Sequence, residues 1–147
     1  MKKLIPPVLT ILTLILMILL HLIWPVRQLL PYFLRWLGIL PLLFGLLISI
    51  SSSRRFSRED TEINTFKQPG KLITDGWFRF SRNPMYLGMV LITMGTWIAL
   101  GSLSPVIGTT TFFLIADRWY VPIEEHALLT RFGQTYLNYK QHVRRWI

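Results

Sequence analysis

The sequence predicts an all-α integral membrane protein with about four transmembrane helices followed by cytoplasmic C-terminal helices. Apolar residues make up 52% of its 147 residues and charged residues only 16%, whereas an average soluble domain is about 25% charged. The apolar residues are gathered into long runs, and most of the charges lie in two blocks. The length fits a single domain over residues 1–147.

The first apolar run, residues 4–24, is predicted to be a transmembrane helix. It contains no charged residue, and about 20 apolar residues cross the roughly 30 Å hydrocarbon core of a bilayer. Lys2 and Lys3 would also suit a signal peptide, but the apolar part of such a peptide is usually about 7–15 residues long. No small-x-small cleavage pattern follows Trp24, so we expect a retained anchor.

The second run, residues 29–50, is predicted to pair with the first as an antiparallel hairpin, because only residues 25–28 connect them. Arg35 lies near the beginning of this run, together with Tyr32 and Trp36. A long basic side chain can extend to the membrane surface, and aromatic residues favour the same interface. We therefore expect the run to span the membrane.

The polar segment 51–83 is predicted to be a cytoplasmic loop that precedes two further apolar runs. These runs, residues 84–100 and 103–120, are short for full spans and predict a shallow or tilted helical hairpin. A turn signal of Gly, Ser and Pro divides them. The remaining residues, 122–147, are polar with helical spacing, and we expect them to form cytoplasmic helices.

Orientation follows from the basic residues. With four spans, fourteen of the sixteen Lys and Arg residues lie on the side of the two termini, and Arg27 and Arg35 are the exceptions. Cytoplasmic segments are enriched in Lys and Arg. We therefore expect both termini and any site beside them to be cytoplasmic, in a bacterial inner membrane.

Composition also narrows the chemistry. The chain has no cysteine and only three scattered histidines, so we expect no disulfide and no metal site. A net charge of +9 suits nucleic acid or an anionic membrane surface. The hydrophobicity favours the membrane, so membrane lipid is the expected partner and nucleic acid is not.

Two polar segments contain the candidate functional residues. In the first, Asn83 is suited to cap a helix whose first turn holds Pro84, and Arg79 and Arg82 precede it. A helix N-terminus beside arginines suits a carboxylate or phosphate. The alternative is that the arginines contact lipid headgroups and the helix simply begins there.

The second segment begins at Pro122, a typical helix start, and Gly133 is a natural stop. Glu124 and Glu125 lie in the first turn, where acids also stabilise the helix dipole without any further role. Further on, Tyr136, Tyr139 and Val143 share one helix face. Ordinary packing is the alternative for those tyrosines.

Three motifs in these segments resemble the isoprenylcysteine carboxyl methyltransferase family. They are Gly-Lys-Leu-Ile-Thr-Asp-Gly from residue 70, Ser-Arg-Asn-Pro-Met-Tyr-Leu-Gly from residue 81, and Glu-Glu-x-x-Leu-x-x-x-Phe-Gly-x-x-Tyr-x-x-Tyr-x-x-x-Val from residue 124. That family belongs to a wider group of membrane methyltransferases that includes phospholipid methyltransferases. The resemblance covers roughly residues 60–147 and keeps the order and spacing of the motifs.

The resemblance implies that S-adenosylmethionine binds at the cytoplasmic face and that a lipophilic acceptor enters from the bilayer. The cofactor-binding positions of the family fall on Gly70, Lys71, Leu72, Ile73, Phe78, Arg82, Asn83, Pro84, Met85, Tyr86, Glu124 and Glu125. An aromatic face can stabilise a sulfonium cation, and an arginine can bind a carboxylate. Asn83 stands where the eukaryotic members have His.

One position departs from the family pattern. The family usually places an Arg four residues before the first Glu of the pair, where it is assigned to the acceptor carboxylate, and here that residue is Tyr120. The nearest basic residue is Arg118, which would not share a helix face with position 120. Arg118 could serve only if residues 117–121 were extended, as Pro122 favours for Val121. Arg118 and Tyr120 are therefore the candidate catalytic residues.

The sequence thus predicts an S-adenosylmethionine-dependent methyltransferase that acts on a lipophilic or small-molecule acceptor. A carboxylate acceptor is already ionised at neutral pH, whereas an amine or a thiol needs a base, for which His126 or Tyr120 are candidates. Isoprenylcysteine O-methylation, phospholipid N-methylation and thiol S-methylation all stay open. A non-enzymatic membrane scaffold that binds anionic lipid is the alternative from another class.

Overall fold

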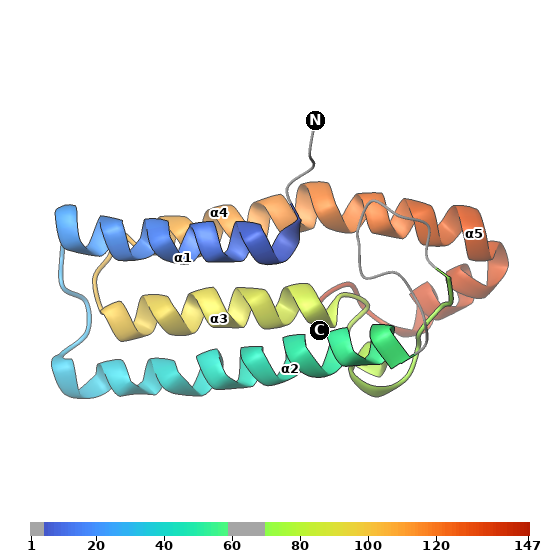
Figure 1. Cartoon of the computed structure of the whole chain (residues 1–147), viewed down its shortest axis with the longest axis horizontal. Helices are drawn as coiled ribbons and strands as arrows, with labels where there is room; N and C mark the ends of the chain where they lie inside the picture. Colours follow the sequence, from blue (N-terminus) through green and yellow to red (C-terminus); the bar gives the residue numbers. More distant parts are fainter. Residues whose placement is uncertain (1–4, 59–69) are drawn as a thin grey trace.

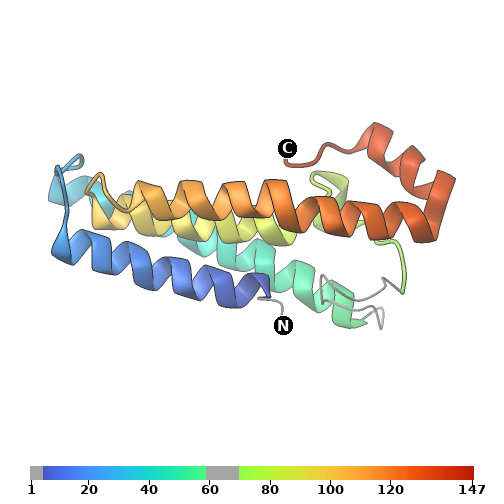
Figure 2. The same ribbon diagram turned by 90° about the horizontal axis from the view of Figure 1, so that it is seen from above.

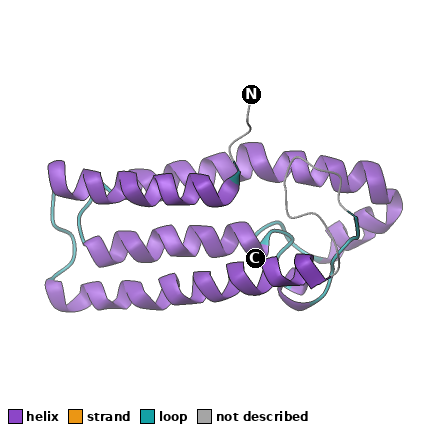
Figure 3. Ribbon diagram, in the orientation of Figure 1, coloured by secondary structure: helices purple, strands orange, loops and turns teal. Residues whose placement is uncertain are grey.

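The computed structural model describes residues 5–58 and 70–147, and within these ranges the chain forms helices joined by loops, with no β-strand (Figure 3). Four helices lie side by side as a bundle (Figure 1). They are α1 (Pro6–Ile23), α2 (Ile39–Arg58), α3 (Pro84–Leu100) and α4 (Val106–Ile115). The predicted all-α class is confirmed.

Two helical stretches are long and apolar enough to cross a membrane. They are Pro6–Ile23 and Tyr32–Ser57, with mean hydropathies of 2.4 and 2.1. The second combines the short 3-10 helix η1 (Tyr32–Gly38) with most of α2. Large apolar side chains on both helices point outward, such as Ile11 and Leu43, which are 58% and 57% exposed. This apolar outer surface indicates membrane association.

The second helix and the fourth run differ from their expected bounds. Helix α2 continues to Arg58 instead of ending near residue 50, so the first residues of the expected loop are helical. Helix α3 has 17 residues, as predicted, whereas α4 has only 10. The expected loop residues 59–69 and the first four residues of the chain lie outside the described residues.

Helix α3 packs against α2 and the last residue of η1 with the backbones almost in contact. A Cβ atom added to Gly45 would lie 2.4 Å from the carbonyl oxygen of Gly88, and one added to Gly95 would lie 2.5 Å from that of Gly38. Such distances leave no room for any side chain at these positions. Since α3 begins directly after Arg82 and Asn83, this contact fixes these candidate residues relative to α2.

The helical run that begins with α4 does not end at residue 120, where the fourth apolar run was expected to end. It continues through the π-helical turn η3 (Ala116–Tyr120) directly into α5 (Val121–His142), and Figure 2 shows this run as one long rod. The extended 117–121 segment that a role for Arg118 would have required is therefore not present. A proline inside a helix clashes with the carbonyl four residues before it, and we attribute the tolerance of Pro122 to the wider π turn that precedes it.

The rod ends at Gly133, as predicted. Its φ of 48° and ψ of −121° break the helix, and glycine adopts positive φ at little cost. The chain then reverses, and a second helical leg brings the residues after His142 back toward the bundle (Figures 1 and 2). This reversal places the C-terminal tail, residues 143–147, beside the start of α3.

Candidate functional site

The tail is bound to the polar segment before α3 by three hydrogen bonds. The backbone N–H of Arg82 donates to the carbonyl of Arg144 at 3.0 Å. The carbonyl of Arg145 accepts from Ser81 Oγ at 3.2 Å and from Asn83 Nδ2 at 3.1 Å. Asn83 therefore occupies the predicted N-cap position, but its side chain does not cap the helix. It holds the tail instead.

Four charged side chains meet where the tail, α3 and the α4–α5 rod converge, and we call them the ionic cluster: Arg82, Asp117, Glu125 and Arg145. Arg82 Nη2 lies 3.0 Å from Glu125 Oε1, and both side chains are about nine-tenths buried. Arg145 Nη2 lies 2.9 Å from Glu125 Oε2, and its Nη1 lies 3.3 Å from Asp117 Oδ1. The two acids raise the pKa of Arg145, and the hydrogen bond with Glu125 is the largest cause.

Glu125 is occupied by cations of the chain itself. Besides the two arginines, Lys140 Nζ approaches its Oε2 at 4.0 Å. The other acid of the cluster, Asp117, accepts a hydrogen bond at its Oδ1 from Trp146 Nε1 at 2.9 Å. Both Glu125 oxygens therefore accept from this chain, which suits a residue that positions Arg82.

Three polar groups near the cluster are buried without a hydrogen-bond partner among the described residues. They are Nε and Nη1 of Arg82 and the hydroxyl of Tyr136. Tyr136 is only 1% exposed. Burial, and then the charge of Glu125, raises the pKa of Tyr136 to about 12, so its hydroxyl is protonated at neutral pH and can donate.

The hydroxyl of Tyr139, about one helical turn further along, has a hydrogen-bond partner. Its hydroxyl donates to the carbonyl of Phe78 at 2.6 Å, and burial raises its pKa above the ordinary value. Phe78 lies in the short helix η2 (Gly76–Arg79) and is 7% exposed. The hydrogen bond connects the second leg of α5 to η2, which follows the first motif.

Glu124 faces a different group of side chains from Glu125. Tyr86 of α3 donates its hydroxyl to Glu124 Oε1 at 2.7 Å. The ring of Tyr86 stacks on that of Tyr120, with centroids 6.1 Å apart and planes 22° apart. A carboxylate thus adjoins two buried aromatic rings, an arrangement suited to a cation.

The structure separates the two candidate catalytic residues. Tyr120 is 4% exposed, whereas the side chain of Arg118 is 81% exposed and lies 3.4 Å from Asp117 Oδ2. The prediction that these positions do not share a face is confirmed. Because residues 117–121 are helical, Arg118 does not gain the inward position that an extended segment would have allowed.

The remaining predicted cofactor positions differ in burial. Ile73, Asn83 and Pro84 are buried, and Met85 is half-buried. Leu72 is also half-buried, whereas Gly70 and Lys71 are exposed.

Sequence reasoning missed Asp117, Arg145 and Trp146. The sequence does show two charged features that could have indicated them: the pair Arg144–Arg145 near residue 147 and Asp117 at the end of an apolar run. No spacing rule connects them, because the contact depends on the reversal at Gly133.

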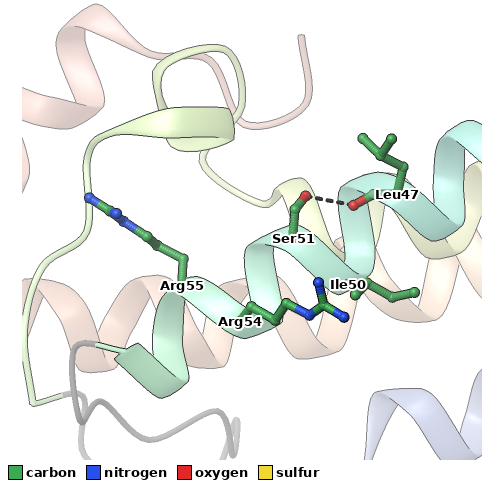
Figure 4. Close-up of a pocket in the computed structure, with 5 residues that line it drawn as sticks. All are labelled: Leu47, Ile50, Ser51, Arg54 and Arg55. Atoms are coloured by element: carbon green, nitrogen blue, oxygen red, sulfur yellow. Dashed lines mark hydrogen bonds between the residues drawn. The ribbon is translucent and has the colours of Figure 1, made fainter.

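A separate cavity of about 470 Å³ lies at the end of α2 and is lined by Leu47, Ile50, Ser51, Arg54 and Arg55 (Figure 4). Arg54 and Arg55 leave the helix in different directions, and Arg55 forms an ion pair with Asp75. None of the lining residues belongs to the ionic cluster. Among the described residues, no group of three or more acids and histidines could hold a metal ion.

Comparison with known proteins gives one family match. The sequence profile of the phospholipid methyltransferase family matches residues 33–135, which covers α2, α3, α4 and most of α5. An uncharacterized protein of Haemophilus influenzae is 36% identical over 63 residues, which are 43% of this chain and 100% of that protein.

Two further relatives are methyltransferases by name. Protein-S-isoprenylcysteine O-methyltransferase B of Arabidopsis thaliana is 34% identical over 76 residues, or 50% of this chain. Protein-S-isoprenylcysteine O-methyltransferase of Schizosaccharomyces pombe is 31% identical over 75 residues, or 49% of this chain. The matched regions span only 37% and 30% of the lengths of these two relatives.

Proposed function

The chain belongs to the phospholipid methyltransferase family, and from this premise we propose that it transfers a methyl group from S-adenosylmethionine to a lipophilic acceptor at the cytoplasmic face of a membrane. Family membership and the named relatives make it a membrane methyltransferase. The cofactor, the acceptor and the side of the membrane belong to the proposal.

The single observation that carries the cofactor proposal is the buried, unpaired part of Arg82. Its Nε and Nη1 have no acceptor among the described residues, although the side chain is only 8% exposed. A buried cationic donor without an acceptor costs free energy, and the carboxylate of S-adenosylmethionine is an anion of the kind that arginine binds. The residues present therefore fit the cofactor.

The remaining predicted positions suit its other groups. Glu124 offers a carboxylate for the amino group or the ribose hydroxyls, and Phe78, Tyr86 and Tyr120 offer aromatic faces for the sulfonium. When bound, S-adenosylmethionine supplies the methyl group and the reactive bond. The chain contributes a buried, aligned environment that excludes water.

For the acceptor, we propose that Tyr120 makes the contact and that Arg118 does not. Tyr120 is buried beside Tyr86, whereas Arg118 is exposed. His126 is exposed as well, so it is less suited than Tyr120 to removing a proton from a buried amine or thiol. The acceptor class thus stays among carboxylate, amine and thiol, as in the sequence-based prediction.

We also propose four spans with both termini in the cytoplasm. Helix α3 and the first turns of the α4–α5 rod would form the third and fourth spans. A helix rises only about 1.5 Å per residue, so these short helices would cross the membrane with local thinning of the bilayer. The uneven distribution of basic residues supports this orientation. Reporter fusions at residue 147 should then read cytoplasmic, and a periplasmic reading would contradict the four-span arrangement.

The test of the proposed function has two steps. Calorimetry on the full chain in detergent should detect binding of S-adenosylmethionine. A transfer assay with a radiolabelled methyl group should then label one of three acceptors: membrane lipid extract, a prenylcysteine analogue or small thiols. Absence of cofactor binding would contradict the proposal, as a lipid-binding scaffold would show none.

A further inference from the structure

We propose that the hydroxyl of Tyr136 and the unpaired N–H groups of Arg82 form one carboxylate-binding site, in which Glu125 positions Arg82 and does not contact the ligand. The inference rests on the proposed function and deepens it. It assigns a role to the buried hydroxyl of Tyr136, which has no partner among the described residues. It also gives Glu125 a positioning role, unlike the other cofactor-binding candidates.

The first step concerns unpaired donors. Arginine carries five N–H groups, and the three on Nε and Nη1 of Arg82 have no acceptor among the described residues. The hydroxyl of Tyr136 is in the same condition. Lys140 lies one helical turn after Tyr136 on the same helix face, and its Nζ approaches Glu125 Oε2 at 4.0 Å. Glu125 Oε1 in turn lies 3.0 Å from Arg82 Nη2, so this face of the second leg of α5 is turned toward Arg82. Most buried polar groups in proteins are hydrogen-bonded, so two unpaired neighbours indicate a missing acceptor.

The second step concerns charge. Glu125 lies within ion-pair distance of Arg82, Arg145 and Lys140. One carboxylate shared by three cations compensates Arg82 only in part. A buried charge requires a partner of opposite sign, so the missing acceptor is better supplied by an anion than by a neutral group.

The third step concerns shape. Two donors from different elements, the segment before α3 and the second leg of α5, call for a ligand with two acceptor oxygens. A carboxylate offers both, and charge-assisted bonds to it are the stronger kind. Tyr136 remains protonated well above neutral pH because burial raises its pKa to about 12, so it is a donor under working conditions.

Two molecules could supply this carboxylate: the cofactor, through its amino-acid part, or the acceptor. The experiment therefore uses two nucleoside probes. S-adenosylhomocysteine carries the amino-acid carboxylate, and 5′-methylthioadenosine lacks the whole amino-acid part. Calorimetry on the full chain in detergent compares both probes, and steady-state assays measure the KM of a carboxylate acceptor, the prenylcysteine analogue.

Tyr136→Phe removes only the hydroxyl. We expect it to weaken S-adenosylhomocysteine binding about ten-fold or more and to leave 5′-methylthioadenosine binding unchanged. Tyr139→Phe is the matched control, because the Tyr139 hydroxyl is already bound to Phe78. It should not change the ratio of the two affinities. A higher KM for the prenylcysteine analogue, with unchanged cofactor affinity, would support the same site with the acceptor as its ligand.

Three results would overturn the inference. Tyr136→Phe could leave both affinities and the KM unchanged, or it could weaken both probes equally, as a packing defect would. The third is failure of the unsubstituted chain to bind S-adenosylhomocysteine, which would contradict the proposed function and the inference with it. The unsubstituted chain thus separates failure of the function from failure of the Tyr136 assignment.

Discussion

The contact between α2 and α3 and the ionic cluster hold the molecule together by different means. At the first, glycines bring two backbones so close that no side chain fits. At the second, long charged side chains connect the tail, α3 and the α4–α5 rod. The glycine contact is tightly packed, whereas Arg82 in the cluster retains donors that have no acceptor within residues 5–58 and 70–147. In the ionic cluster, the unpaired donors belong to a charged side chain, which is why we propose that a ligand binds there.

The largest expected effect is at the glycine contact. In Gly95→Leu the new Cβ would meet the carbonyl of Gly38 at 2.5 Å and the backbone of Leu42 at 2.6 Å. Backbone cannot move aside as a flexible side chain can, so we expect a loss of more than about 3 kcal/mol of stability. Thermal unfolding in detergent measures it, with the exposed Leu43→Ala as control. Equal unfolding temperatures for the two variants would contradict the close packing.

Next in size is Glu125→Gln, which tests the cluster as a structural element. The change keeps the shape but leaves Arg82 buried beside a neutral group, and breaking a buried ion pair typically costs about 3 kcal/mol or more. Asp75→Asn is the control, because the Arg55–Asp75 pair is about two-fifths exposed and such pairs contribute at most about 1 kcal/mol. The comparison uses unfolding temperature. A smaller loss for Glu125→Gln than for the control would show that the cluster does not stabilise the fold.

Glu124→Gln should act on binding and leave the fold intact. Glu124 accepts from Tyr86 and is outside the ionic cluster, so removing its charge should weaken S-adenosylmethionine binding about ten-fold. Unfolding temperature should change little. Calorimetry gives the affinity, again with Asp75→Asn as control. An unchanged dissociation constant would assign Glu124 a purely structural role.

The smallest effect is expected at Arg118. Its side chain is 81% exposed, and surface substitutions usually change stability by no more than about 0.5 kcal/mol. Arg118→Lys should leave both turnover and cofactor affinity nearly unchanged in the methyl-transfer assay. A sharp fall in turnover would instead identify a guanidinium contact to the acceptor and would contradict the proposed role of Tyr120.

The same contrast explains how much could be predicted from the sequence. Helices α1 and α3 and the apolar first part of α2 were predictable, because a long apolar run between polar or turn-forming segments has few alternatives. The continuity of α4 and α5 was not, because Pro122 is typical of a helix start and nothing in the local pattern indicates the π turn before it.

The site was predictable only in part. The motifs brought Arg82, Glu124 and Glu125 to attention, but they could not show that Glu125 binds Arg145, twenty residues away in the sequence. That contact depends on the reversal at Gly133 and on the docking of the tail. Ion pairs between charged residues far apart in the sequence leave no periodic pattern, so they cannot be predicted from spacing.

The position of the tail also sets an order of assembly. A ribosome delivers α1 to α4 first, and these helices can enter the membrane and pack while the last residues are still unmade. The contacts of Arg144, Arg145 and Trp146 can form only after the chain has been synthesised through the reversal at Gly133. Closure of the ionic cluster therefore depends on residues that are synthesised after all four helices of the bundle.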